Sequence, residues 1–154
     1  GLDPATEIPA PVELDLPLTD RTLPNFGGAA CSPTGTQTLA DALRISCNTA
    51  FGQLGLDLGA DTLREQAEAF GFSQALSVPM RVTESSFPAD PDAPQTALSA
   101  IGQYEVRVTP LQVAMTAAAV ANDGVLLRPY SVAAVRSDDL EVVDQTETEE
   151  LGRA

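Results

Sequence analysis

The sequence contains no lysine, no histidine and no tryptophan among its 154 residues, so all eight of its basic residues are arginine. A phosphate-binding P-loop requires its lysine, a Ser-His-Asp or Cys-His centre requires its histidine base, and Schiff-base catalysis requires a lysine amine. The usual histidine-containing zinc sites are excluded as well, and we expect neither a metal ion nor another cofactor. Taken alone, the chain has few ways to form a complete enzyme.

Positive charge and long apolar runs are also scarce. Twenty-two acidic residues give a net charge of −14, which disfavours binding to nucleic acid or to an anionic membrane surface. Apolar residues make up 44% of the chain, which is ordinary for a globular domain. No apolar run is long enough to span a membrane, and the first residues lack the pattern of a signal peptide. We therefore expect a membrane anchor only in a longer parent chain.

The first half of the chain predicts an irregular start followed by helices. Residues 1–37 are rich in proline and read as an irregular lead-in, with one short strand possible at 12–16. Apolar spacing then predicts three short helices, which begin at a capping box on Thr38, near Asn48, and at Asp61 as N-cap. The prolines of residues 73–97 predict a long loop.

The second half predicts one buried helix and a β-hairpin. Thr109 followed by Pro110 predicts an N-cap with proline at the first helical position. The uncharged stretch after it, residues 111–122, is apolar on two faces and therefore predicts a helix buried all round. Residues 130–136 and 140–144 predict the two strands of a hairpin. The acidic tail, residues 146–154, predicts disorder.

The sequence has two cysteines, Cys31 and Cys47. Two isolated cysteines without histidine do not make a zinc site, so they are either free buried thiols or one disulfide. The residues alone do not decide between these alternatives.

Residues 38–51, TLADALRISCNTAF, carry the pattern Ser46-Cys47-Asn48 between two predicted helices. Ser-x-Asn alone is a weak pattern, and a helix end followed by an asparagine N-cap would explain it. The whole segment, however, resembles the second motif of penicillin-binding transpeptidases. Those proteins have a threonine-leucine start, an alanine-leucine pair, Ser-x-Asn and then an aromatic residue.

Further segments follow in the order and spacing of the same family, and together they extend the resemblance over about residues 22–145. They are Phe70-Gly71-Phe72 at the end of a helix, Ile101-Gly102-Gln103, Val108-Thr109-Pro110-Leu111-Gln112, Ala121-Asn122-Asp123-Gly124, and Arg128-Pro129-Tyr130. The chain is most similar to the monofunctional, class B type of penicillin-binding protein.

The resemblance implies a partial transpeptidase domain over residues 38–145. The expected fold is mainly α, formally α+β: the helical subdomain of the penicillin-binding transpeptidase and serine β-lactamase-like fold, with a small hairpin near the C-terminus. The family cross-links cell-wall stem peptides through an acyl-serine, using the motifs Ser-x-x-Lys, Ser-x-Asn and Lys-Thr-Gly. A chain without lysine holds only the second, so we expect an inactive central fragment of an enzyme.

The resemblance also implies roles for individual residues. The Ser46 hydroxyl would join a proton relay with the two lysines, since a hydroxyl both donates and accepts. Asn48 would offer its amide to a carbonyl of the acylating peptide, and neither residue would be the nucleophile. An extracytoplasmic family favours a disulfide between Cys31 and Cys47, which would fix the loop that carries this motif. We expect Gln103 to be a buried structural amide.

Partners and location follow from the same resemblance. They are D-Ala-D-Ala stem peptides and β-lactams, bound through the complete domain at the extracytoplasmic face of the cell membrane, with cell-wall or division proteins as further partners. A trimmed domain would expose apolar surface and could form a homodimer. Two alternatives remain: a non-catalytic envelope-binding module with a degenerate transpeptidase fold, and a relative of the β-lactam sensors or β-lactamases.

Overall fold

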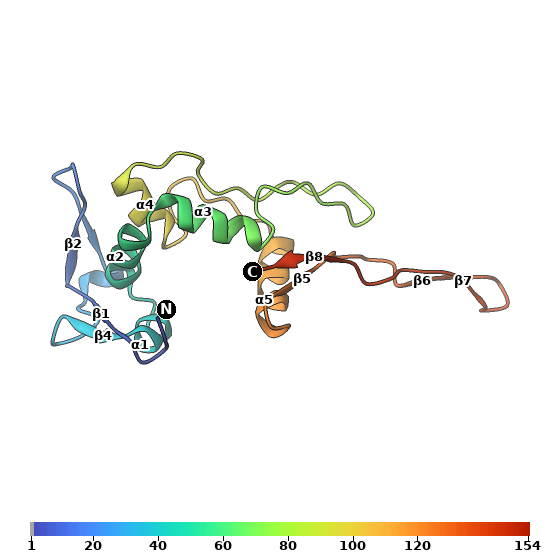
Figure 1. The fold of residues 1–154 in the computed structure, drawn as a ribbon, viewed down its shortest axis with the longest axis horizontal. Coiled ribbons are helices and arrows are strands. Elements are labelled where there is room, and N and C mark those ends of the chain that lie inside the picture. The colour runs from blue at the N-terminus through green and yellow to red at the C-terminus, as the bar shows by residue number, and fades with distance from the viewer. Residues whose placement is uncertain (1) are drawn as a thin grey trace. The chain divides into compact units, whose positions relative to one another are not determined.

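The computed structural model describes residues 2–154, and within them the chain is a mixture of helices and short strands (Figure 1). The helices are α1 (Leu39–Arg44), α2 (Asn48–Leu58), α3 (Ala60–Ala69), α4 (Ala93–Ser99), α5 (Pro110–Ala121) and the 3₁₀ helix η1 (Phe26–Gly28). The strands are β1 (Glu7–Pro9), β2 (Glu13–Asp15), β3 (Thr22–Pro24), β4 (Thr36–Thr38), β5 (Val125–Leu127), β6 (Ala134–Arg136), β7 (Val142–Gln145) and β8 (Glu150–Arg153). The expected α and β elements are both present, but a predominance of helix is not confirmed. None of the helices in the described residues has the length and hydrophobicity required to cross a membrane.

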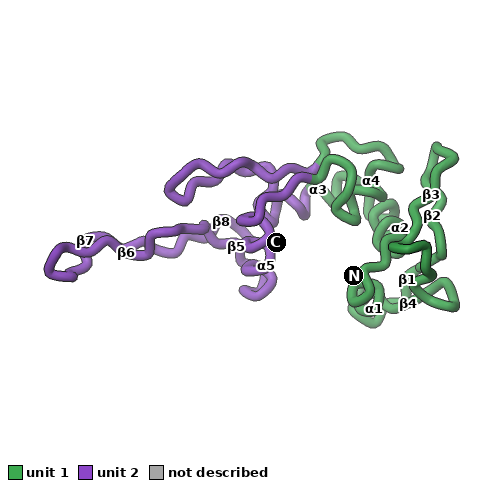
Figure 2. Tube along the Cα trace, turned by 180° about the vertical axis from the view of Figure 1, so that it is seen from behind, with its two compact units in different colours: residues 1–64, 88–106 green, residues 65–87, 107–154 purple. Residues whose placement is uncertain are grey.

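The chain forms two compact units (Figure 2). Unit 1 comprises Gly1–Arg64 and Pro88–Val106, and unit 2 comprises Glu65–Phe87 and Arg107–Ala154. Each unit contains two antiparallel two-stranded sheets, β1-β4 and β2-β3 in unit 1, and β5-β8 and β6-β7 in unit 2.

Residues 1–37 contain more regular structure than the sequence predicted. The strand expected at 12–16 is present as β2, which pairs with β3, while β1 pairs with β4. Each strand has three residues, too few to produce a clear alternating pattern. Pro9 and Pro24 stand at strand ends, where a missing amide hydrogen is tolerated. The prolines therefore mark strand ends here, and the prediction of an irregular segment was wrong in this respect.

Helices α1 and α2 begin where the sequence predicted. The Thr38 hydroxyl oxygen accepts a hydrogen bond from the Asp41 amide at 3.1 Å, which satisfies a donor of the first turn. Arg44 donates to the Asp41 carboxylate at 3.0 Å, and this bond lowers the pKa of Asp41, with a further contribution from Thr38. Helix α2 begins at Asn48 and ends before Gly59, whose φ of 81° suits glycine.

Helix α3 begins two residues earlier than predicted, since an N-cap at Asp61 would make residue 62 the first of the helix. Its first residue is Ala60, and Asp61 lies in the first turn, so Asp61 is not the N-cap. The Asp61 carboxylate accepts a hydrogen bond from Arg64. Gly71 has a φ of 96°, as expected for a glycine that follows a helix.

Helix α4 lies in part within residues 73–97, for which a loop was predicted. Asp92 and Gln95 form a reciprocal capping box, in which each side chain accepts from the other residue's amide at 2.9 Å. Pro94 lies in the first turn, where a helix does not need its amide hydrogen. The prediction failed because this proline was read as a helix breaker and the Asp92–Gln95 cap was overlooked.

Close packing between α2 and α4 holds unit 1 together. A Cβ atom built on Gly55 would overlap the Cβ of Ala100, so glycine is needed for the two segments to approach. Buried residues on both sides of α2 form two apolar clusters: Ile8, Ala10, Ala42, Cys47 and Ala50 in one, and Leu14, Leu16, Leu23 and Ala97 in the other.

Helix α5 is the centre of unit 2. Thr109 caps it by accepting from the Gln112 amide at 3.2 Å, as predicted. One face packs in the cluster of Leu76, Met115, Ala119 and Leu126. The expectation of burial all round was wrong, because Val113 is 54% exposed and Val120 is 68% exposed. Unit 2 supplies packing partners for one face of α5 and leaves these two valines open to solvent.

The predicted hairpin is present in unit 2, with a shorter first strand. Strand β6 starts at Ala134 instead of Tyr130 and pairs with β7. The carboxylates at its turn and along β7 are exposed, as expected for a solvated hairpin: Asp138, Asp139, Glu141 and Asp144.

The tail, residues 146–154, was predicted to be disordered, but it contains β8. This strand pairs with β5, and Leu151 packs against the apolar cluster of unit 2. Arg128 also forms a two-point ion pair with Glu149, whose pKa it lowers through a direct hydrogen bond. Acidic composition predicted solvation, but the pairing with a distant strand is not visible in local sequence.

Candidate functional site

The Ser46-Cys47-Asn48 motif forms the turn that joins α1 to α2. Two backbone bonds close the end of α1, from the Ser46 amide to Leu43 at 3.1 Å and from the Cys47 amide to Ala42 at 2.9 Å. Ser46 has a φ of 57°, the left-handed conformation that glycine usually adopts at this position. For a residue with a Cβ this conformation costs about 1 to 2 kcal/mol.

The middle residue of the motif is fixed by a disulfide. Cys47 is buried and bonded to Cys31, with an S–S distance of 2.09 Å and a Cα–Cα distance of 5.9 Å. The expected pairing of these two cysteines is confirmed. The bond ties the turn to a segment 16 residues earlier, so Cys47 cannot move independently of that segment.

Asn48 is the first residue of α2, and its side chain is held by a neighbouring loop. Its Nδ2 donates to the Pro24 carbonyl at 3.1 Å. An amide group has two such hydrogens, so one fixes the orientation of the side chain and the other can serve a ligand.

Two residues that the sequence analysis did not select, Asn25 and Thr49, hold the start of α2 from behind. The Asn25 Oδ1 accepts from the Thr49 amide at 3.0 Å, and the Thr49 hydroxyl donates to the Pro11 carbonyl at 2.7 Å. Asn25 also donates to the carbonyls of Pro11 and Val12, at 3.4 and 3.3 Å. Asn25 is only 6% exposed. Local sequence did not reveal this role, because the partners of Asn25 lie 13 to 24 residues away.

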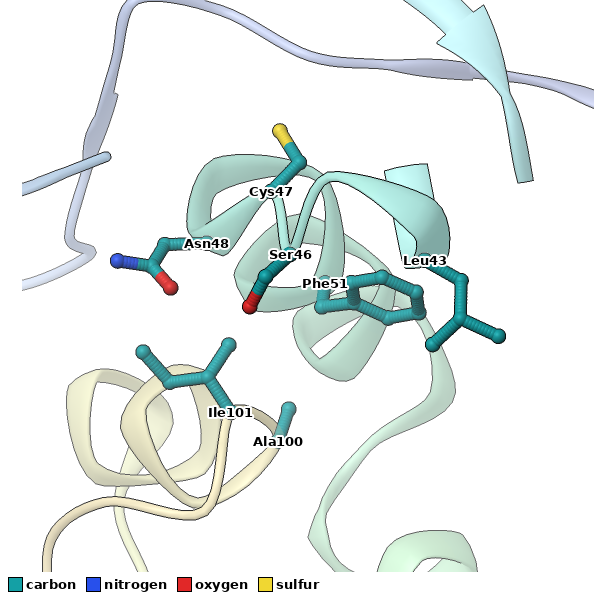
Figure 3. Close-up of a pocket in the computed structure, with 7 residues that line it drawn as sticks. All are labelled: Leu43, Ser46, Cys47, Asn48, Phe51, Ala100 and Ile101. Atoms are coloured by element: carbon teal, nitrogen blue, oxygen red, sulfur yellow. The ribbon is translucent and has the colours of Figure 1, made fainter. Parts of the chain in front are cut away.

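The motif opens onto a pocket of about 330 Å³ within unit 1. Figure 3 shows the Ser46 hydroxyl directed toward the segment that carries Ile101, with the Cys47 sulfur on the opposite side of the turn. Asn48 lies beside Ser46, so a hydroxyl and a carboxamide stand at one rim. The lining residues are Leu43, Ser46, Cys47, Asn48, Phe51, Ala100 and Ile101.

The pocket lining contains hydrogen-bonding groups but no titratable one. Ser46 and Asn48 supply its polar side chains, and the sulfur of Cys47 is locked in the disulfide. These seven residues can orient a bound group and pass a proton along, but they cannot hold one as a general base near neutral pH. Within residues 2–154, Cys, Asp and Glu side chains form no group of three or more suited to a metal ion.

Two other polar residues, Gln103 and Ser85, lie outside this pocket. Gln103 is exposed, so the expectation of a buried amide was wrong; its backbone amide bonds to Leu98 at 2.9 Å and ends α4 beside Gly102, whose φ is 75°. Ser85, in the loop of unit 2, is buried and accepts from the Thr109 amide at 3.1 Å. The hydrogen bonds of Gln103 and Ser85 therefore give both residues a structural role.

Comparison with known proteins identifies the class. Residues 19–153 match the family described as the penicillin binding protein transpeptidase domain. Since this match covers most of the chain and includes the Ser46-Cys47-Asn48 turn, the chain belongs to the penicillin-binding protein transpeptidase family.

Individual relatives narrow the resemblance to one type. The chain is 42% identical, over 155 aligned residues, to peptidoglycan D,D-transpeptidase PbpA of Mycolicibacterium smegmatis, and covers 32% of that protein. It is 38% identical to penicillin-binding protein A of Mycobacterium tuberculosis in its penicillin G acyl-enzyme complex, with a TM-score of 0.94 over 99% of this chain and 35% of that one. The transpeptidase domain of a peptidoglycan glycosyltransferase from Eggerthella lenta follows at a TM-score of 0.80 and 32% identity. The chain therefore resembles PbpA-type, class B proteins and spans about a third of their length.

Proposed function

We propose that this chain is the Ser-x-Asn portion of a peptidoglycan D,D-transpeptidase whose complete form cross-links cell-wall stem peptides. The observation that carries the proposal is the placement of Ser46 and Asn48 at the rim of one pocket. The whole of this chain is 42% identical to part of a D,D-transpeptidase. The disulfide between Cys31 and Cys47 supports a location outside the cytoplasm, where such bonds persist.

In the proposed reaction, the serine of a Ser-x-x-Lys motif attacks the carbonyl between the two D-alanines of a stem peptide. An ester bond to the serine forms, the peptide C–N bond breaks, and the serine proton reaches the departing D-alanine amine. An amine of a second stem peptide then attacks the ester, which makes the cross-link and frees the serine. A β-lactam enters at the first step and remains as the acyl-serine.

Ser46 and Asn48 have separate roles in this scheme. The Ser46 hydroxyl passes the proton toward the leaving amine, donating one hydrogen while accepting another. Asn48, whose orientation is set by its bond to the Pro24 carbonyl, offers its second amide hydrogen to a carbonyl of the bound peptide. The two lysines of the scheme lie outside this chain, which has none.

The test compares a fluorescent penicillin on the complete protein, its Ser46→Ala variant, and the 154-residue chain alone. We expect rapid labelling of the complete protein, labelling about 100-fold slower for Ser46→Ala because a proton-transfer group is lost, and none for the chain alone. Thr38→Ala, a surface cap variant, is the control and should label at the rate of the complete protein. A complete protein that is never labelled would instead support a non-catalytic envelope module, and Ser46→Ala at the unaltered rate would remove Ser46 from the site.

A further inference from the structure

Asn25, whose side chain bonds to the start of α2 just after the motif, is not part of the Ser-x-Asn pattern. Asn25 belongs to the turn after β3, more than 20 positions before Ser46, and its carboxamide is buried. Its carboxamide bonds to two segments. The oxygen accepts at the start of α2, and the nitrogen donates to the strand connection at Pro11 and Val12. A buried amide satisfied on both sides is rigid, since any displacement leaves a polar group without a partner.

The bonds of Asn25 join the parts that the motif depends on. Its Oδ1 accepts a hydrogen bond from the backbone amide of Thr49. This amide is one of the donors that have no partner within the first turn of α2. Thr49 adds a second bond, from its hydroxyl to the Pro11 carbonyl at 2.7 Å. Asn48 lies between Cys47 and Thr49, so both of its chain neighbours are fixed, one by the disulfide and one by Asn25.

The residue before Asn25 completes the arrangement. The Pro24 carbonyl accepts from the Asn48 side chain at 3.1 Å. A shift of Asn25 would therefore move both the backbone that follows Asn48 and the acceptor that orients its amide. Displacements of about 1 Å at a catalytic constellation can cost about 100-fold in rate.

We propose that Asn25 is a positioning residue for the transpeptidation site, which acts through Thr49 and Pro24 to hold Asn48 in its working geometry. This inference rests on the proposed function. Loss of the Asn25 carboxamide should therefore lower the rate of acylation by more than its effect on folding accounts for. The affinity of the first, noncovalent complex should change little.

The experiment measures acylation of the complete protein by a labelled penicillin, with the noncovalent dissociation constant and the acylation rate separated by stopped flow. For Asn25→Ala we expect the acylation rate to fall between about 10-fold and 100-fold. Asn25→Asp keeps an acceptor for the Thr49 amide at the positive end of α2 and should recover part of that loss.

Gln112→Ala is the matched control. Gln112 is also a buried carboxamide, which donates to the Phe70 carbonyl at 2.6 Å within unit 2. Gln112→Ala should lower the melting temperature about as much as Asn25→Ala does. It should leave the acylation rate within about twofold of that of the unaltered protein, a negligible free-energy change. If Asn25→Ala is also within that range, or if Gln112→Ala slows acylation as much, the inference is overturned.

Thr49→Val keeps the test valid if Asn25→Ala does not fold. This variant preserves the shape of the side chain and removes the hydroxyl, with its bond to the Pro11 carbonyl and its 3.5 Å contact with the Cys47 sulfur. The bond from Asn25 to the Thr49 amide remains, so a smaller loss of rate in the same direction is expected. An unchanged rate would count against the positioning role. The proposed function fails separately, if the unaltered complete protein is not acylated at all.

Discussion

Unit 1 and unit 2 are stabilised in different ways. Unit 1 has two apolar clusters, a disulfide and a buried polar network. One of the clusters and the disulfide include Cys47, and the polar network holds Thr49, the residue after the Ser46-Cys47-Asn48 turn. Unit 2 has one apolar cluster, on a single face of α5, while Val113 and Val120 on the same helix are exposed. Unit 1 has exposed apolar side chains as well, among them Leu18 at 95% and Phe26 at 94%, so exposure alone does not separate the units. They differ in that the motif of unit 1 is held by a disulfide and a buried polar network, whereas the single cluster of unit 2 is apolar.

The largest expected effect tests the single cluster of unit 2. Met115→Ala should lower the free energy of unfolding by about 2 to 5 kcal/mol, because it removes buried apolar atoms and leaves a cavity. Val113→Ala, on the exposed face of the same helix, is the matched control and should change it by less than about 0.5 kcal/mol. Urea unfolding of the 154-residue chain measures both, and similar losses for the two variants would mean that both faces of α5 are covered in solution.

The disulfide is the corresponding test for unit 1. Replacing Cys31 and Cys47 together by alanine should cost about 3 kcal/mol, the loop-closure entropy expected for a link across 16 residues. Hydrogen exchange read by mass spectrometry should show loss of protection at the start of α2 and no change in α5. Equal loss in both helices would contradict a stabilisation by this disulfide that is confined to unit 1.

A smaller effect is expected where α2 and α4 meet. Gly55→Ala places a methyl group against Ala100, and overpacking of this kind costs about 1 to 3 kcal/mol. Gly52→Ala is its counterpart one turn earlier. Its new methyl meets the ends of the buried Leu23 and Leu14 side chains at 2.7 and 3.1 Å, a less severe overlap than the one with the Ala100 Cβ at Gly55. Thermal unfolding should therefore rank Gly55→Ala well below Gly52→Ala in melting temperature, and the reverse order would disprove the close approach at Gly55.

The smallest expected effect is that of pH on the surface pairs, one in each unit. Arg44 lowers the pKa of Asp41 in unit 1, and Arg128 lowers the pKa of Glu149 in unit 2. A carboxyl group whose pKa is depressed by folding stabilises the folded state above its unfolded pKa and loses that contribution as pH falls through its folded pKa. Carboxyl-carbon NMR should show that the pKa of Glu149 is lower in the unaltered protein than in the Arg128→Gln variant. The same pKa for Glu149 in both proteins would contradict the pair.

The sequence was most informative where the controlling interactions are local. The caps at Thr38 and Thr109 involve residues three positions apart and were predicted correctly. The cap on α4 is equally local, but it was missed because Pro94 was read as a helix breaker. The pairing of β5 with β8 and the bonds of Asn25 join distant segments, and no short-range pattern encodes them.

The candidate site was located by motif, and its supporting residues were not. Ser46, Asn48 and the Cys31–Cys47 bond came from the resemblance to the transpeptidase family, whereas Asn25 and Thr49 appear only in the folded chain. The exposure of Val113 and Val120 was missed because apolar composition indicates burial without showing what covers each face.

The central claim is that Ser46 belongs to a transpeptidase site without being its nucleophile. The most direct measurement is peptide mapping by mass spectrometry of the complete protein after reaction with penicillin G, in the unaltered form and as Ser46→Ala. The account predicts one adduct in both forms, on a serine outside these 154 residues. An adduct on Ser46, or on any other serine of this chain, would contradict it.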